Sequence, residues 1–229
     1  MPDPISKKAD CTMCGRMKIE SKHSKIISDF FGCKFSVPAN NNLSPGQNVA
    51  TLISNDANKG ENHDSNEQIS YQQLDANWGM QPSWSKRLLI NAQSETVLTK
   101  NTFKVAIKTH RCLIPCSGWY EWRTEGGKKQ KYLFSHVNEE PFLMAGIWYL
   151  NNSENQSNSQ GDKQGNSPEA KRQLLTLTTA PNAKCADYHQ RMPVIILPQY
   201  RDFWFQAPAE QLVPLFQAID ENYIKVTKA

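Results

Sequence analysis

The stretch Gly118–Val137 reads GWYEWRTEGGKKQKYLFSHV and decides the fold class. Two runs rich in aromatic residues flank the turn Glu125–Lys128 (EGGK), and a Gly-Gly pair at the centre of a four-residue turn is typical of a β-hairpin. The stretch therefore predicts two antiparallel strands, Gly118–Arg123 and Lys131–Val137, joined by that turn.

Six further runs on either side of this hairpin have strand character. They are Asn48–Ile53, Ile69–Leu74, Arg111–Ile114, Phe142–Leu150, Gln173–Thr179 and Val194–Leu197. Two polar segments, Ser54–Gln68 and Asn151–Glu169, separate the first run from the second and the fourth from the fifth. Such segments bury too little apolar surface to offset the entropy of ordering. We expect them to be long loops between paired strands.

Helical signals are fewer. Ser21 is expected to cap a helix that ends at Gly32, and its apolar residues Ile26, Ile27, Phe30 and Phe31 share one face. Helical spacing also occurs in Glu95–Thr109, Pro198–Phe205 and Ala209–Ile219, the last of which is shortened or broken by Pro214. Because strands outnumber helices and alternate with them irregularly, we predict a single α+β domain built on antiparallel pairing.

Composition narrows the functional class. The 229 residues are 38% hydrophobic with a mean hydropathy of −0.63. No run approaches the roughly 18 apolar residues needed to span a bilayer, and the opening MPDPISKKAD lacks the apolar centre of a secretory signal. We therefore expect an intracellular protein without a membrane partner. The net charge of +4 is compatible with an anionic partner but does not identify one.

The six cysteines are better interpreted as reduced thiols than as disulfides. Cys11 and Cys14 have the C-x-x-C spacing of a zinc or redox site, and Cys112 with Cys116 could supply a second ligand pair. However, only a polar tail precedes the first pair, and alternate side chains of the strand-like second pair point to opposite sides. We predict no metal and no cofactor, and we expect the other cysteines to be core residues. These are Cys33, Cys112, Cys116 and Cys185.

Six short motifs follow one another along the chain. They are Met13-Cys14-Gly15-Arg16, Asn42-Leu43-Ser44-Pro45-Gly46, Trp78-Gly79, Ile90-Asn91-Ala92-Gln93-Ser94-Glu95-Thr96, Gly118-Trp119-Tyr120-Glu121-Trp122 and His189-Gln190-Arg191-Met192-Pro193. In this order, from Met13 to about Leu197, the chain resembles the SOS response-associated peptidase (SRAP) family, abasic-site processing proteins that crosslink themselves to DNA. The resemblance implies a barrel-like, predominantly antiparallel β core with flanking helices.

The resemblance implies a chemistry that can be checked against the residues. An abasic sugar opens to an aldehyde, and an N-terminal cysteine presents an amine and a thiol that close on it as a thiazolidine. An α-amine with a pKa of about 7.8 is unprotonated far more often at neutral pH than a lysine amine at about 10.4. By resemblance Cys14 is the crosslinking nucleophile, Glu121 transfers protons during Schiff-base formation, His189 shuttles a proton to the sugar oxygen, and Asn91 orients the reactants.

A DNA partner requires a phosphate track and surfaces for unstacked bases. Lys100, Lys104 and Lys108 recur at intervals of four and would share a helical face that continues to Arg111, with no acidic residue between Glu95 and Glu121. By resemblance Arg16 and Arg191 hold phosphates near the lesion. Candidate wedges or stacking surfaces are Pro45, Trp78 and Trp84, although core packing is an equal alternative for Trp78. We expect single-stranded DNA with abasic sites as the partner and a monomeric protein.

The match departs from the family pattern in two respects. Gln93 and Gln190 stand where the family usually has Arg and often Asp, which removes one expected phosphate contact. In addition, residues 1–13 precede Cys14, and an acylated amine cannot form a Schiff base. We expect this extension to be an artefact, or to be removed by an aminopeptidase or by self-cleavage. Residues 14–229 then form the domain.

Three alternatives remain at this point. The chain could be a noncovalent module for single-stranded DNA. It could be a peptidase acting on other proteins through Cys14, His189 and Glu121. It could also be a zinc or redox protein. The expected location is cytoplasmic and nucleoid-associated in a bacterium, or nuclear in a eukaryote.

Overall fold

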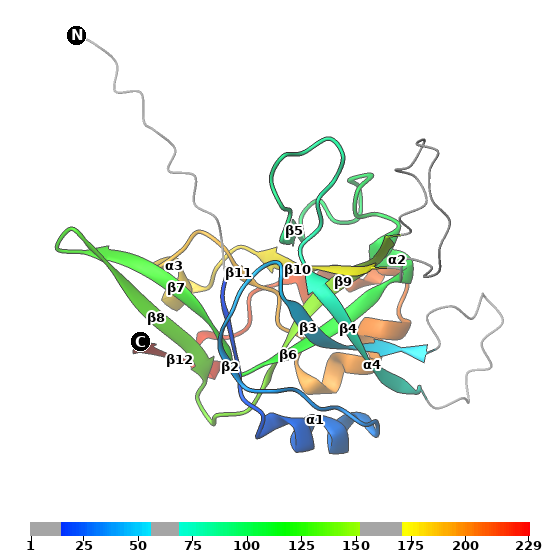
Figure 1. Cartoon of the computed structure of the whole chain (residues 1–229), viewed down its shortest axis with the longest axis horizontal. Coiled ribbons are helices and arrows are strands. Elements are labelled where there is room, and N and C mark those ends of the chain that lie inside the picture. Colours follow the sequence, from blue (N-terminus) through cyan, green and yellow to red (C-terminus); the bar gives the residue numbers. More distant parts are fainter. Residues whose placement is uncertain (1–14, 56–68, 152–170) are drawn as a thin grey trace, which may run out of the picture.

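The computed structural model describes residues 15–55, 69–151 and 171–229, and these form two mostly antiparallel sheets with a few short helices (Figure 1). The strands are β1 (Met17–Ile19), β2 (Asn40–Leu43), β3 (Asn48–Ser54), β4 (Tyr71–Trp78), β5 (Asn91–Gln93), β6 (Arg111–Cys116), β7 (Gly118–Glu125), β8 (Lys128–His136), β9 (Phe142–Asn151), β10 (Lys171–Thr179), β11 (Met192–Pro193) and β12 (Ile224–Lys228). The predicted α+β class is confirmed.

The helices are short, and residues of α1 and α4 share a core with residues of the larger sheet. They are α1 (His23–Phe31), α2 (Ala106–Thr109), α3 (Ala183–Ala186) and α4 (Arg201–Gln206), with 3-10 helices η3 (Pro198–Tyr200), η4 (Ala209–Phe216) and η5 (Glu221–Tyr223). In the part of the chain that the structure describes, no helix is long and apolar enough to cross a membrane.

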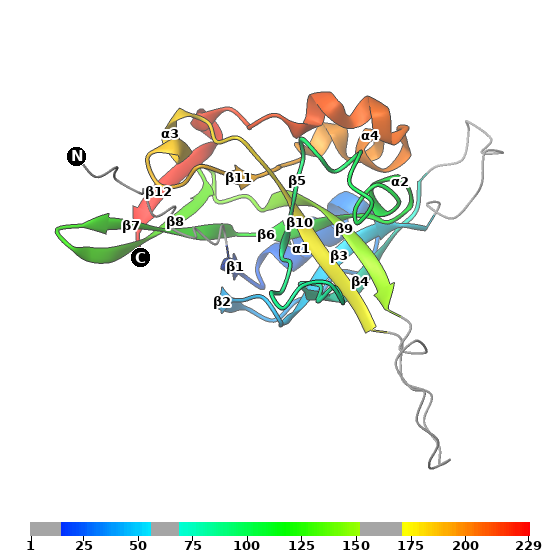
Figure 2. The same cartoon turned by 90° about the horizontal axis from the view of Figure 1, so that it is seen from above.

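The smaller sheet has the strand order β12-β8-β7-β1-β2 and contains the predicted hairpin. Its turn is formed by Gly126 and Gly127, whose φ angles of 54° and 79° suit the tight connection of β7 to β8. Both views show the β7–β8 hairpin extending beyond the rest of the described fold (Figures 1 and 2). The hairpin prediction is confirmed.

The larger sheet has the order β11-β10-β4-β3-β6-β9. Its β9 also pairs with β10, so the sheet curls around on itself. The expected term barrel-like describes this sheet loosely. The two strand pairs predicted around the polar segments, β3 with β4 and β9 with β10, are present and antiparallel. Strand β10 additionally runs parallel to β4 and to β5.

Two local predictions are wrong. Glu95–Thr109 is not one helix: turns precede α2, and their backbone bonds mix i→i−3 and i→i−4 partners. The run Thr96–Val105 is rich in β-branched residues and in Thr and Asn side chains that compete for backbone groups, which weakens a regular helix. The predicted strand Val194–Leu197 contains only an isolated bridge between Met144 and Ile195, and the two-residue strand β11 lies just before it.

The first predicted helix is present as α1 and ends, as expected, at Gly32 with a φ of 62°. Its cap differs from the prediction, because Lys22 occupies the N-cap and no side chain caps the helix. Ile27 and Phe31 are buried, whereas Ile26 is 49% exposed. The apolar face is therefore narrower than the sequence pattern indicates.

Two groups of buried residues form the core. One lies under α1 and α4 and includes Phe31, Leu52 and Trp204. The other includes Trp119 and Phe134 of the smaller sheet and Met144 of the larger sheet, so it joins the two sheets. Because strand side chains alternate, the inward position of Trp119 also directs Glu121, two residues later, to the inner side of β7.

Candidate functional site

Glu121 is the buried carboxylate of strand β7. It pairs across the hairpin with Tyr132 and is 5% exposed. Its charge acts on the thiol of Cys185, whose pKa is raised to about 12 chiefly by burial and secondarily by Glu121. Glu121 is therefore near enough to Cys185 for its charge to act on the thiol.

His189 lies one turn beyond Cys185, after α3. The His189 backbone N–H donates to the Cys185 carbonyl at 3.0 Å, and the ring Nδ1 accepts from the Arg191 N–H at 3.1 Å. Burial lowers the pKa of the imidazole, opposed by a hydrogen bond with the Arg191 backbone. At neutral pH the ring is consequently uncharged, and one of its nitrogens is held in place.

Packing holds this segment against the hairpin. The ring of Tyr188, the residue before His189, lies 4.8 Å from the ring of Tyr132 and 5.1 Å from that of Phe134. The guanidinium of Arg123 lies 4.6 Å from the centre of the Tyr188 ring. Glu121 and His189, 68 positions apart in sequence, are thus held on one side of β7 and β8.

Asn91 approaches from strand β5. The Thr176 hydroxyl of the parallel strand β10 donates to Asn91 Oδ1 and also contacts the Ile90 carbonyl at 3.3 Å. The Asn91 amide nitrogen has no partner within the described ranges and is half-buried. The side chain is oriented to donate a hydrogen bond. The contribution of Thr176 was missed, because only the pairing of β5 with β10 reveals it.

Cys14, the expected nucleophile, lies outside the described residues. The described chain starts at Gly15, and the carbonyl of Arg16 accepts the Tyr120 N–H at 3.0 Å. Strand β1 then pairs Met17 with Trp119. The described chain thus begins beside the part of β7 that holds Glu121. Arg16 is half-buried and has no ion pair among the residues described.

Arg191 is not a free cation in this structure. Its guanidinium binds both carboxylate oxygens of Glu95 at 2.5 and 2.6 Å and the Thr178 carbonyl at 2.6 Å. The bond from Arg191 is the main cause of the lowered pKa of Glu95. Arg191 therefore braces β11 against the segment that follows β5. The sequence offered one overlooked signal, namely that Glu95 belongs to the same motif as Asn91.

Two residues predicted to bind DNA are in the core, and those predictions are wrong. Trp78 is fully buried, and its indole N–H donates to the Ile90 carbonyl at 3.1 Å, so neither ring face is available for stacking. Arg111 is 7% exposed and donates to the Ala207 carbonyl at 2.7 Å. Burial lowers the pKa of Arg111 to about 10. Its place at the start of β6 directs it inward instead of along the lysine row.

The three lysines of the predicted stripe are exposed although the continuous helix is absent. The Lys104 N–H bonds to the Lys100 carbonyl at 2.9 Å, which keeps these two residues one turn apart. Lys108 instead pairs with Glu210 at 2.8 Å. Among the described residues, only Lys100 and Lys104 of this stripe lack an acidic partner.

Two loops keep their predicted surface residues accessible. Trp84 is 69% exposed in a loop closed by the bridge between Met80 and Leu89. Pro45 is half-buried in the turn between β2 and β3, and the next residue, Gly46, donates to the Trp78 carbonyl at 2.7 Å. Trp84 and Pro45 are therefore both at least partly exposed at the surface.

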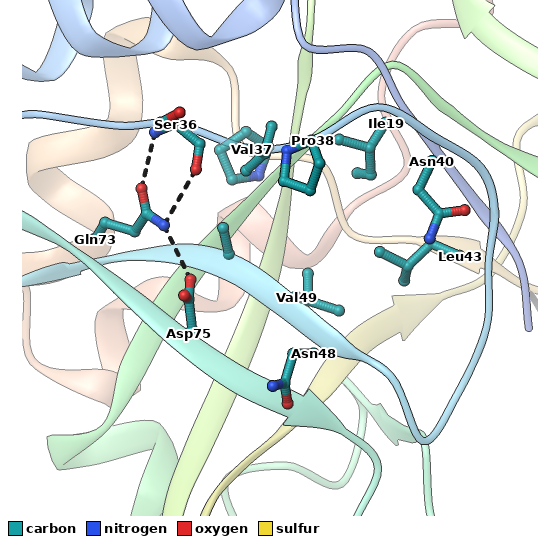
Figure 3. Close-up of a pocket in the computed structure, with 12 residues that line it drawn as sticks. Ile19, Ser36, Val37, Pro38, Asn40, Leu43, Asn48, Val49, Gln73 and Asp75 are labelled. Atoms are coloured by element: carbon teal, nitrogen blue, oxygen red, sulfur yellow. Dashed lines mark hydrogen bonds between the residues drawn. The ribbon is translucent and has the colours of Figure 1, made fainter.

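A hollow of about 220 Å³ lies beside β2, β3 and β4 (Figure 3). Gln73 on its wall donates to Asp75 at 2.9 Å and exchanges hydrogen bonds with the backbone of Ser36. None of the predicted catalytic residues lines it. These wall groups satisfy one another and present no arrangement for catalysis.

The cysteines that the structure describes are free thiols, and they are Cys33, Cys112, Cys116 and Cys185. Cys112 and Cys116 are buried in β6, and burial raises the pKa of both. Within residues 15–55, 69–151 and 171–229, no three His, Cys, Asp or Glu side chains are grouped to hold a metal. The pair Cys11 and Cys14 lies outside those ranges.

Comparison with solved structures concerns the fold alone. A crystal structure of a protein from Bordetella bronchiseptica superposes with a TM-score of 0.71 at 20% identity, covering 94% of this chain and 99% of that one. A crystal structure from Bacteroides thetaiotaomicron gives a TM-score of 0.69 at 20% identity, with 94% and 91% covered. The described architecture is therefore shared with other proteins at low sequence identity.

Sequence comparison identifies relatives. Abasic site processing protein YoqW of Bacillus subtilis strain 168 is 29% identical over 205 residues, covering 84% of this chain and 80% of the relative. Abasic site processing protein YedK of Escherichia coli K12 is 31% identical over 130 residues, covering 56% and 53%. The family model described as SOS response associated peptidase (SRAP) matches residues 13–229. The chain therefore belongs to the SOS response associated peptidase family.

Proposed function

We propose that this chain processes abasic sites in single-stranded DNA and attaches itself covalently to the ring-opened sugar through Cys14. The names of the relatives support the substrate class. The observation that carries the proposal is the start of the described chain beside β7, where Met17 pairs with Trp119 and the Arg16 carbonyl accepts the Tyr120 N–H, next to the buried carboxylate of Glu121. Cys14 directly precedes Gly15, the residue at which the described chain begins, in the sequence.

The proposed reaction has two covalent steps. The Cys14 α-amine adds to the sugar aldehyde, and loss of water forms a Schiff base. The thiol then adds to the imine carbon, its proton passes to the nitrogen, and a five-membered thiazolidine results. The only other product is the water released in the first step.

The described side chains supply proton transfer and orientation. Glu121 is buried close to β1, where it protonates the departing hydroxyl and accepts the thiol proton. His189 is a neutral imidazole whose Nδ1 accepts the Arg191 N–H, so its Nε2–H is available as a hydrogen-bond donor to the sugar oxygen as the ring opens. Asn91, whose oxygen is held by Thr176, donates its amide hydrogens to the opened sugar.

Exposure of the Cys14 amine requires removal of residues 1–13. Cleavage by the chain itself, with the Cys14 thiol attacking the preceding carbonyl, fits the peptidase in the family description. Trimming by an aminopeptidase after initiation at Met13 gives the same product. Intact-mass measurement of purified protein distinguishes chains that begin at Met1 from chains that begin at Cys14. A chain retaining residues 1–13 that still crosslinks would contradict this requirement.

A crosslinking gel tests the function. The full chain is incubated with a uracil-containing oligonucleotide treated with uracil glycosylase, and a heat-stable shifted band is expected. Cys14→Ala should abolish that band. Cys33→Ser, which changes a free thiol that the structure describes, should leave the band unchanged. Equal crosslinking by Cys14→Ala would overturn the mechanism. Salt-sensitive retention without a crosslink would instead indicate noncovalent binding.

A further inference from the structure

The outer face of the smaller sheet carries a second group of residues that the reaction does not use. In the hairpin register Trp122 stands opposite Lys131, and Thr124 stands opposite Lys129. Across β8, Lys225 of β12 stands opposite Ser135. Directly paired residues in antiparallel strands share a face, and alternate residues along a strand do as well. One side of the sheet, opposite to the side of Glu121, therefore carries Trp122, Lys129, Lys131 and Lys225. These four residues are the basic sheet face.

The basic sheet face is open to solvent. Trp122 is 38% exposed, Lys129 and Lys225 are exposed, and Lys131 is half-buried. Trp122 has no ring partner among the residues that the structure describes. The Lys131 ammonium lies 3.7 Å from the centre of the Tyr120 ring, which fixes one positive charge beside the exposed indole.

Positive charge predominates on this side, because the nearby Glu20, whose charge acts on Tyr120, is itself paired with Lys18 and Lys22. None of the residues that β7, β8 and β12 direct to this side is acidic: they are Gly118, Tyr120, Trp122, Thr124, Lys129, Lys131, Leu133, Ser135, Lys225 and Thr227. The three lysines of the basic sheet face have no ion pair within the described ranges. On the inner side, by contrast, Glu125 binds Arg123 and Lys228. A row of positive charges without acidic partners creates a local potential that attracts an anionic partner.

The edge of β7 connects the two sides. Strand β1 pairs with β7 only as far as the bond between Arg16 and Tyr120, and no other described strand covers that edge toward Glu125. A DNA strand held at Glu121 reaches Trp122, the next residue, by crossing this edge. The remaining hairpin extends beyond the body of the fold (Figures 1 and 2).

We propose that the basic sheet face binds the single-stranded DNA that flanks the abasic site, with a base stacked on Trp122 and phosphates along the three lysines. This proposal rests on the proposed function for its DNA partner. A sheet face with an exposed aromatic ring between cations combines the two elements of sequence-independent binding to single strands. The basic sheet face is distinct from the stripe at Lys100 and Lys104, which lies in the turns between β5 and α2.

The test measures binding of undamaged oligothymidylate, so that crosslinking does not contribute. Strands of about 6 and about 20 nucleotides are compared by fluorescence anisotropy, because single-strand sites span roughly 4–16 nucleotides. The variant combines Lys129→Gln, Lys131→Gln and Lys225→Gln. Its matched control, Lys25→Gln with Lys34→Gln and Lys171→Gln, removes the same charge from exposed positions elsewhere. Thermal unfolding verifies that both variants remain folded.

The triple variant is expected to weaken binding of the longer strand at least tenfold more than the control does. Its slope of log affinity against log salt should fall by about 2, since each lost phosphate contact removes about 0.7 for single strands. Trp122→Ala should weaken binding of the longer strand about tenfold without changing that slope.

Three results would overturn the proposal. The first is an equal loss of affinity in the triple lysine variant and in its control, and the second is an unchanged affinity of the variant for the longer strand. The third is competition by polyglutamate as effective as by DNA of equal charge, which would indicate an acidic peptide as the partner. If the abasic crosslink is lost while oligothymidylate binding is unchanged, the Cys14 mechanism is contradicted. The basic sheet face remains supported as a DNA-binding surface in that case. The two proposals therefore fail separately.

Discussion

From Glu121 onward, the two sides of strand β7 differ in how far their side chains are exposed. Trp119 and Glu121 face inward and are 1% and 5% exposed, whereas Trp122 faces outward and is 38% exposed. A shift of one position moves a side chain from a packed interior beside His189 to a solvated row of lysines. The comparison teaches that aromatic and charged residues in one short motif serve separate purposes, which the register of the hairpin assigns.

The largest expected difference between the sides concerns stability. Trp119 stacks on Phe134 at 5.2 Å and joins the two sheets, so Trp119→Ala should lower the free energy of unfolding by about 3–5 kcal/mol. Trp122→Ala should lower it by less than about 1 kcal/mol. Urea titration of both variants measures the difference. Equal losses would show that the outward tryptophan also supports the core.

The next difference concerns the rate of crosslinking. Glu121→Gln removes the proton-transfer group with little change of volume and should slow crosslink formation about 100-fold at saturating DNA. Thr124→Val, a control of similar size change on the outer side, should leave the rate unchanged. Gel time courses with abasic oligonucleotides measure both. A Glu121→Gln rate within twofold of the parent would remove this carboxylate from the mechanism.

A smaller effect is expected from pH. Burial keeps the pKa of His189 in the folded chain below its unfolded value of about 6.5, so unfolding takes up a proton between those two values. The contribution of neutral His189 is fully present above about pH 6.5 and decreases as the pH falls toward the lowered pKa. Urea titration at pH 7.5 and 5.5 should show a smaller loss in His189→Gln than in the parent. An unchanged loss would argue against a buried neutral ring.

The smallest effect is expected on the outer side. Lys129→Gln should change the free energy of unfolding by no more than about 0.5 kcal/mol, since the side chain is exposed and has no ion pair in the described structure. Thermal unfolding at low and high salt measures this. A loss above about 1 kcal/mol would show that the lysine supports the hairpin and is not reserved for a partner.

Much of the architecture could be predicted from local signals. Glycines in the EGGK turn and at Gly32, together with the polar segments between apolar runs, marked the hairpin, the end of α1 and two strand pairs. The helix predicted over Glu95–Thr109 is wrong in the run before α2. Lysines that recur every fourth residue indicate a shared helical face even where the backbone forms turns. The short strands β1, β2 and β5 were not expected. They exist through pairing with distant partners rather than through their own composition.

The sequence by itself determined which residues carry reactive groups and in what order they occur, because amines, thiols, carboxylates and imidazoles are properties of residue types. Tertiary structure decided which of them meet and which are covered. It buried Trp78 and Arg111, bound Arg191 to Glu95, and held Asn91 through Thr176. The physical reason is that burial and hydrogen bonding depend on strand register and on pairing between residues far apart in the chain, and motif spacing contains neither.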